Sequence, residues 1–266
     1  MKTYFVDSFT TEKFKGNPAG VCFLDEAIAD EMMQNIAREI GFSETAFVKR
    51  LESNEVCSIR YFSPKKEIPL CGHATLAAAK IIFDTTDLDS ILFITGQQVE
   101  LKIGKAAEQI VMEFPVYDTS DIDVPKEMLR ALGIDEFVKA SYSANNKIIM
   151  IEITNSDRLA LLRPDFDALI RSYEGINGVL VTAPSRSTEY DFHYRYFWPW
   201  AGTNEDPVTG AVQTFLTKYW ADKMVKNKLR AFQSSERTGS MTTELRNEKV
   251  LVYGDAVIML EGDFFV

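Results

Sequence analysis

The pattern of apolar and polar residues predicts many short strands and a few helices. Residues 3–9 and 19–24 have the apolar, β-branched composition of strands, and they flank a turn that contains Gly16, Asn17 and Pro18. Residues 29–41 have the spacing of an amphipathic helix that ends at Gly41. The pattern then predicts strands over residues 42–49, 57–64, 91–96, 99–104 and 109–115.

Residues 72–84 predict a different kind of helix. The segment GHATLAAAKIIFD is rich in alanine and apolar almost all round, so this helix is expected to be deeply buried. The second half repeats the order: a strand over 147–154, a helix over 165–173, strands over 178–184 and 191–199, and a helix over 206–224, followed by strands and turns. The polar segment 117–129 is the best candidate for a linker.

A short motif occurs in both halves. Arg-Tyr-Phe-x-Pro begins at Arg60 and again at Arg195, 135 residues later, and eleven residues after each arginine stand Cys71 and Asp206. A repeat of this length has the size of a domain. We therefore expect two related halves, residues 1–116 and 117–254, with a C-terminal strand at about 255–266 completing the first half.

Composition and charge exclude several classes of protein. The 266 residues are 46% hydrophobic and 26% charged, which is typical of a soluble globular protein, and no apolar run reaches the length of a membrane span. The start lacks the apolar core of a signal peptide, so three widely spaced cysteines indicate reduced thiols in the cytoplasm. A net charge of −10 argues against nucleic acid but permits a small anionic substrate. Neither a nucleotide-binding glycine motif nor a zinc-type Cys/His spacing is present, so we expect no cofactor and no metal.

The starts of the two buried helices are candidate functional positions. Unpaired N–H groups near Gly72–His73 and Thr209–Gly210 could hold a substrate carboxylate, with Cys71, His73 and Asp206 beside it if the halves share a cleft. Each side chain also has a structural interpretation. Asp206 before Pro207 suits a helix cap, Cys71 suits a small buried hydrophobe, and His73 suits a neutral first-turn histidine.

Glu44 is a candidate acid–base group because of strand parity. Phe42, Ala46 and Val48 share its face of the predicted strand, so the carboxylate lies on an apolar face. Burial there would favour a general acid or base. The alternative is a glutamate at a strand end that points to solvent.

Four segments together resemble a known family over nearly the whole chain: VDSFTTEKFKGNPAGV, SETAF, RYFSPKKEIPLCGHATLAAA and NEDPVTGA. The chain resembles the phenazine-biosynthesis-like (PhzF-like) isomerases, of the diaminopimelate epimerase-like fold. The resemblance implies an α+β fold of two pseudo-symmetric halves, each a barrel-like, mostly antiparallel sheet around a central helix, with the active site between them. It also implies a homodimer.

The resemblance also implies roles for individual residues. Glu44, His73 and Asp206 match the family's catalytic positions, and substrate-binding roles fall on Asn17, Ser43, Gly72, Thr209 and Gly210. The family usually has DPVTGSAH where this chain has DPVTGAVQ, so Ala211 replaces a serine and Gln213 a histidine.

The expected function is a cofactor-independent isomerase that moves a proton on a small carboxylic acid, similar to trans-2,3-dihydro-3-hydroxyanthranilate isomerase. Two alternatives stay open: a racemase or epimerase that uses Cys71 and Asp206, and a small-acid binding protein without turnover, which Gln213 favours.

Overall fold

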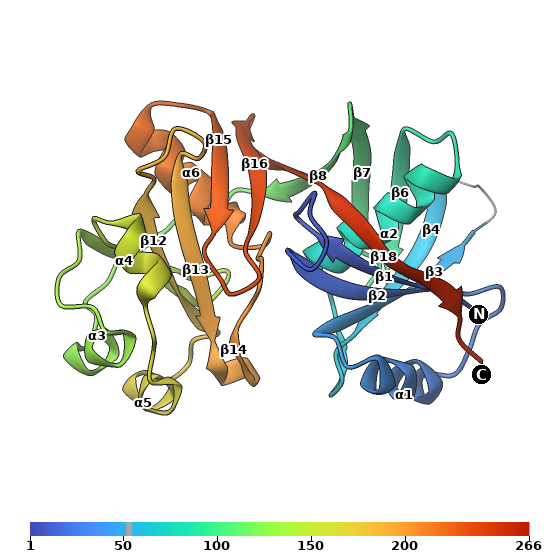
Figure 1. Ribbon diagram of the computed structural model, residues 1–266, viewed down its shortest axis with the longest axis horizontal. Coiled ribbons are helices and arrows are strands. Elements are labelled where there is room, and N and C mark those ends of the chain that lie inside the picture. Colours follow the sequence, from blue (N-terminus) through green and yellow to red (C-terminus); the bar gives the residue numbers. More distant parts are fainter. Residues whose placement is uncertain (52–54, 266) are drawn as a thin grey trace. The chain divides into compact units, whose positions relative to one another are not determined.

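The chain folds into two units, each built from parallel and antiparallel strands and a few helices (Figure 1). The computed structural model describes residues 1–51 and 55–265. One unit comprises Met1–Glu113 and Leu251–Val266, and the other Phe114–Val250. Of the C-terminal strand expected at 255–266, Val266 lies outside the described residues. Both units combine strands and helices without a regular βαβ order, so the fold is α+β, as expected.

The first unit contains two longer helices and a sheet. Its helices are α1 (Asp30–Ile40) and α2 (Gly72–Thr85). Its strands are β1 (Lys2–Ser8), β2 (Asn17–Phe23), β3 (Glu44–Arg50), β4 (Val56–Phe62), β5 (Glu67–Ile68), β6 (Ser90–Thr95), β7 (Glu100–Ala106), β8 (Gln109–Pro115) and β18 (Ala256–Asp263). Gly41 ends α1 in the left-handed conformation, with φ of 74° and its N–H donating to the Ala37 carbonyl.

Helix α2 is the centre of this unit. Ten of its residues are buried, and the helix contacts β1, β2, β3 and β18. The alanines at 77, 78 and 79 have no exposed surface. Strand β3 lies between the two helices. The Phe47 side chain packs against residues of α1, whereas Glu44, on the other face, meets α2. The parity argument therefore holds, although both faces of β3 are buried.

The second unit is also built from helices and strands. Its helices are α3 (Lys126–Leu132), α4 (Ser156–Leu161), α5 (Phe166–Ser172) and α6 (Gln213–Met224), with a short 3-10 helix η1 (Pro199–Ala201). Its strands are β9 (Ser120–Asp121), β10 (Lys139–Ser143), β11 (Ile148–Glu152), β12 (Gly178–Pro184), β13 (Phe192–Trp198), β14 (Thr203–Glu205), β15 (Lys228–Gln233), β16 (Gly239–Arg246) and β17 (Lys249–Gly254), the last of which continues into the first unit.

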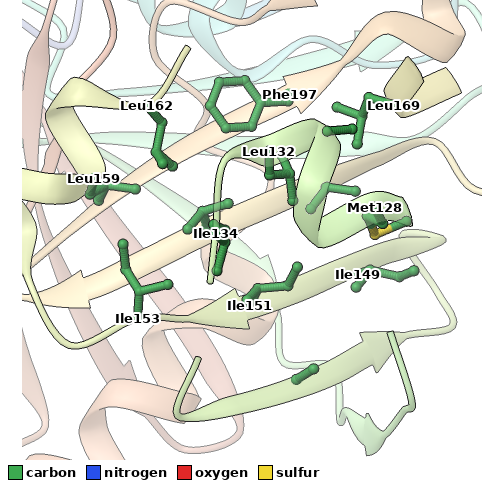
Figure 2. Packing of buried hydrophobic residues seen from close by; sticks show 14 of the residues in the cluster. Met128, Leu132, Ile134, Ile149, Ile151, Ile153, Leu159, Leu162, Leu169 and Phe197 are labelled. Atoms are coloured by element: carbon green, nitrogen blue, oxygen red, sulfur yellow. The ribbon is translucent and has the colours of Figure 1, made fainter. Parts of the chain in front are cut away.

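An apolar cluster between the helices and the sheet stabilises the second unit. Figure 2 shows Met128 and Leu132 of α3 with Ile149 and Ile151 of β11 in this cluster, and all four side chains are fully buried. Burying a side chain of this size contributes roughly 1.5–3 kcal/mol. The linker predicted over 117–129 is therefore wrong at its end, because residues 126–129 form the start of this core helix.

The two units share one pattern of strand pairing. In the first unit β1–β2 is antiparallel, β2–β3 parallel, β3–β4 antiparallel, β4–β6 parallel and β6–β7 antiparallel. In the second unit β10–β11, β11–β12, β12–β13, β13–β15 and β15–β16 follow the same sequence of directions. Strands β4 and β13, which carry the two Arg-Tyr-Phe motifs, hold equivalent places. The predicted equivalence of these strands is confirmed.

The repeated motif builds the same local structure twice. Arg60 donates to both carboxylate oxygens of Glu67 at 2.8 Å, and its guanidinium lies 5.2 Å from the Phe62 ring centroid. Arg195 donates to both oxygens of Glu205 at 2.7 Å, and its guanidinium lies 4.9 Å from the Phe197 ring. Arginine and phenylalanine two residues apart share a strand face, which explains the spacing of the motif.

The start of the second central helix differs from the sequence prediction. We expected a helix from Asp206, capped by its side chain, but α6 begins at Gln213. Residues 206–212 form irregular turns instead. The Asp206 carboxylate accepts from the Thr209 hydroxyl, so it closes a local turn and caps no helix.

The two arginines differ in burial, and this predicts different costs of removing them. Arg195→Met leaves Glu205 without its partner and also removes donors to the Leu159 and Leu162 carbonyls. We expect a loss of about 3–5 kcal/mol, because the two side chains are only 7% and 17% exposed. Arg60→Met should cost roughly 1 kcal/mol, because the Arg60 and Glu67 side chains are 28% and 30% exposed. Chemical denaturation of both variants measures the difference, and equal losses would contradict this reading of the repeat.

Candidate functional site

The first group of candidate residues lies where α2 begins. Strands β2 and β3 are parallel neighbours, so the residues that begin them lie at the same end of the sheet. Asn17 begins β2, Glu44 begins β3, and His73 is the second residue of α2. The fold thus brings together three residues of which the outermost two, Asn17 and His73, are 56 positions apart in the sequence.

These side chains form a connected set. His73 Nε2 lies 3.3 Å from Glu44 Oε2, and His73 Nδ1 lies 3.2 Å from Asn17 Nδ2. Glu44 is 6% exposed, His73 7% and Asn17 fully buried. The prediction that Glu44 is buried is confirmed, and the alternative of a solvent-facing glutamate is wrong.

The hydrogen bonds define the state of the histidine. An amide Nδ2 can only donate, so Nδ1 of His73 accepts and Nε2 carries the proton. Nε2–H then donates to the Glu44 carboxylate. Burial lowers the pKa of His73 below its usual value of 6.5, and the nearby Glu44 charge opposes this only in part. The pair is therefore a neutral imidazole with a carboxylate acceptor.

Cys71 extends the set at the N-cap position of α2. Its Sγ lies 3.4 Å from His73 Nδ1 and 3.8 Å from Nε2, and the residue is 7% exposed. Its side chain caps no backbone N–H of α2. Cys71 is thus buried, as its structural interpretation requires, and it also contacts the imidazole.

Gly72 and Ser43 lie beside these groups in the chain. Gly72 is the first residue of α2, so its N–H belongs to the helix turn that has no intrahelical acceptor. The Ser43 hydroxyl oxygen is buried and makes no hydrogen bond to any other described residue. The Gly72 N–H is thus available to a ligand at the start of α2, whereas the Ser43 hydroxyl is an unsatisfied group one residue before Glu44.

The second group of candidate residues forms the turn that precedes α6. Asp206 is 8% exposed, and its carboxylate accepts from the Thr209 hydroxyl. Tyr194 donates to the Thr209 carbonyl at 3.1 Å. Burial raises the pKa of Tyr194 far above its usual value, so the hydroxyl stays protonated as a donor.

Gln233 holds this turn in place, and sequence reasoning missed it. Its Oε1 accepts from the Thr209 N–H at 2.8 Å, and its Nε2 donates to the Asp206 carbonyl at 2.5 Å. The Thr209 N–H, which we expected to hold a substrate carboxylate, is therefore engaged within the protein. The sequence carried no local signal for this contact, because no strand was predicted over residues 228–233, where β15 lies.

Gly210 and Gln213 complete this turn. The Gly210 carbonyl accepts from the Gln213 N–H at 3.0 Å, at the first residue of α6. The Gln213 side chain is fully buried and accepts from the Thr217 hydroxyl at 3.0 Å. Gln213, which stands where the family has a histidine, thus supports the helix.

Among the described residues, one set has the arrangement of metal ligands. The ligand atoms of Glu44, Cys71 and His73 all lie within 4.8 Å of one another. None of the helices that the structure describes is long and apolar enough to cross a membrane.

Comparison with known proteins identifies the family. A family model described as "Phenazine biosynthesis-like protein" matches residues 6–262. The chain belongs to the phenazine biosynthesis-like family. It is 37% identical to phenazine biosynthesis-like domain-containing protein 1 of Mus musculus, over 97% of each chain. It is 38% identical to an uncharacterized isomerase of Halalkalibacterium halodurans, over 99% of this chain and 98% of that one.

A solved structure of the family has the same fold. The PhzF-family protein of Enterococcus faecalis is 33% identical, covers 100% of this chain and 99% of its own, and gives a TM-score of 0.93. The resemblance inferred from the four sequence segments is confirmed, and the fold is the diaminopimelate epimerase-like fold of this phenazine biosynthesis-like family.

The buried histidine predicts how stability changes with acid. In the folded protein the pKa of His73 lies below 6.5, so the unfolded chain binds the proton first as pH falls. His73 therefore lowers stability as pH decreases through about 6.5, and has no such effect above it. When the pH falls from about 7.5 to about 5.5, we expect the free energy of unfolding to decrease less in His73→Gln than in the wild type.

His193→Gln is the comparison variant. Burial also lowers the pKa of His193, but this side chain is only partly buried, so its removal should change the slope less. Denaturant unfolding at several pH values measures both slopes. An unchanged slope in His73→Gln would show that folding does not lower the pKa of His73.

Proposed function

We propose that this protein is a cofactor-independent isomerase that moves a proton at a carbon atom of a small carboxylic acid. The observation that carries the proposal is the buried chain from Asn17 through a neutral His73 to the Glu44 carboxylate, at the start of a central helix. The family membership and the relative named as an isomerase support the same reaction class.

Glu44 is the proposed acid–base group. Its Oε2 accepts from His73 Nε2–H, which leaves the other carboxylate oxygen able to take a proton from substrate carbon. The same carboxyl group then returns the proton to another carbon of the substrate. His73, held in one tautomer by Asn17, fixes the orientation of Glu44 through the whole cycle.

A carboxylate on the substrate would bind at the start of α2. The first N–H groups of this helix have no intrahelical acceptors, and the positive end of the helix dipole favours an anion. The unsatisfied Ser43 hydroxyl offers one further hydrogen bond. We propose ring acids of the dihydro-hydroxyanthranilate type as the substrate class, following the family resemblance, and Asp206 as a second acid–base group.

Glu44→Gln tests the proposal most directly. The amide keeps the shape and still accepts from His73, but it cannot take up a proton. We expect turnover to fall by roughly 10²-fold or more, the scale of general acid–base catalysis. Stability should be unchanged or slightly higher, because a neutral amide costs less to bury than a carboxylate. The measurement is deuterium incorporation from D₂O into a panel of small carboxylic acids, followed by NMR.

Glu100→Gln is the matched control, because Glu100 is an exposed glutamate on β7. It should exchange deuterium at the wild-type rate. A stable Glu44→Gln protein that also exchanges at this rate would remove Glu44 from the reaction. If no acid exchanges with the wild type although acids bind, the protein is a binding protein without turnover.

The contact between Cys71 and His73 favours one second candidate, a racemase or epimerase in which Cys71 removes the proton. Cys71→Ser separates the two reactions. With Glu44 as the base, the serine variant should keep exchange within about tenfold of the wild type, because no reacting group is lost. With Cys71 as the base, exchange should fall as steeply as in Glu44→Gln or more. Exchange rates of the two variants, measured with one substrate, decide between them.

A further inference from the structure

We propose that Glu44, Cys71 and His73 form a binding site for a thiophilic divalent metal ion, with Zn²⁺ as the physiological candidate. The site lies entirely within the first unit, where α2 begins and β3 starts. Zn²⁺ would bind Cys71 Sγ, His73 Nε2 and Glu44 Oε2.

The spacing of the three ligand atoms fits this ion. Typical zinc–ligand distances in a tetrahedral site place a nitrogen and an oxygen ligand about 3.3 Å apart, and a sulfur and a nitrogen ligand about 3.6 Å apart. In this protein His73 Nε2 lies 3.3 Å from Glu44 Oε2 and 3.8 Å from Cys71 Sγ. These two distances differ from the ideal ones by a few tenths of an ångström at most, and the thiol and the carboxylate lie within 4.8 Å of each other.

The ligand types also select the metal. A thiolate, an imidazole and a carboxylate match Zn²⁺ and Cd²⁺, whereas Mg²⁺ and Ca²⁺ take oxygen ligands. Three protein ligands leave one tetrahedral position for water or for a carboxylate of a bound acid. Each of the three residues is buried but keeps a small exposed fraction, between 6% and 7%.

The surroundings of the histidine supply the second requirement of a zinc site. A histidine that binds a metal through one nitrogen almost always donates its other N–H to a neighbouring acceptor. Asn17 lies 3.2 Å from Nδ1, and rotation of its amide would turn Oδ1 toward an Nδ1–H. Asn17 can thus support either the free or the metal-bound tautomer.

The protons balance in a simple way. When the ion binds, the Cys71 thiol releases its proton to solvent, and the His73 proton moves from Nε2 to Nδ1 by exchange with solvent. Glu44 is then a metal ligand and cannot accept a proton from carbon. Metal occupancy would therefore switch off proton transfer reversibly, and a chelator would restore it.

Cadmium is the spectroscopic probe for the test. Cd²⁺ is added to protein that was treated with a chelator and kept reduced with a phosphine. We expect a thiolate-to-cadmium absorption band in the ultraviolet that saturates at one equivalent, and that Zn²⁺ abolishes by displacing Cd²⁺. The band should be absent in Cys71→Ala and unchanged in Cys57→Ala, which removes another buried free cysteine.

Zn²⁺ affinity, measured by competition with a chromophoric chelator, tests the other two ligands. Glu44→Gln and His73→Gln should each weaken binding by at least about tenfold, and Glu100→Gln should leave it unchanged. The proposal is overturned if the wild type shows no band, if the band persists in folded Cys71→Ala, or if it disappears in Cys57→Ala instead. Should Cys71→Ala not fold, the Glu44→Gln affinity alone decides. None of these readouts requires isomerase activity, so their failure is distinct from failure of the proposed function.

Discussion

The enclosure of α2 is the constraint on which the first unit depends. Apart from Lys80 and Asp84, this helix has almost no polar face, so it is stable only where strands surround it. Small residues allow that close approach. The alanines at 77, 78 and 79 have no exposed surface, and a side chain at Gly254 would place its Cβ 2.7 Å from Leu76 of the helix. Once the helix is fixed in this way, its start is fixed too, and with it the position of Cys71 and His73 opposite the first residues of β2 and β3.

This position explains why a carboxylate is tolerated in the interior. A buried charge without partners costs several kcal/mol, and Glu44 is compensated by the imidazole N–H at 3.3 Å. The imidazole in turn is neutral because burial opposes its protonation, and its Nε2–H donates to Glu44 while Nδ1 accepts from Asn17. In this hydrogen-bonded series of Asn17, His73 and Glu44, each residue fixes the protonation or orientation of the next, which is the arrangement that acid–base chemistry needs. The same closeness of oxygen, nitrogen and sulfur is what suits a thiophilic metal ion.

Most of the fold could be predicted from local patterns, and the exceptions have identifiable causes. Strand parity placed Glu44 on the face that meets α2, and Gly41 marked the end of α1. Helix α3 was missed because its start was assigned to a linker, although its buried Met128, Ala131 and Leu132 have helical spacing. Strand β10 escaped detection because it is short and largely polar. The start of α6 was predicted too early because Asp206–Pro207 has the local signature of a helix cap. Gln233 engages both ends of this turn from a distant strand, a contact that no local pattern reveals.

The two units show how one scaffold carries different chemistry. In both, an arginine of the repeated motif binds a glutamate through two hydrogen bonds, and Cys71 or Asp206 follows that glutamate within four positions. After this common pair the units diverge. In the first unit, the helix starts directly after Cys71, and the Cys71 thiol and the His73 imidazole lie at its start. In the second, six further residues separate Asp206 from Gln213, and side chains of β13 and β15 hold the turn. Because the paired arginine and glutamate fix the chain just before the variable segment, that segment can change its length and its reactive groups without disturbing the strands.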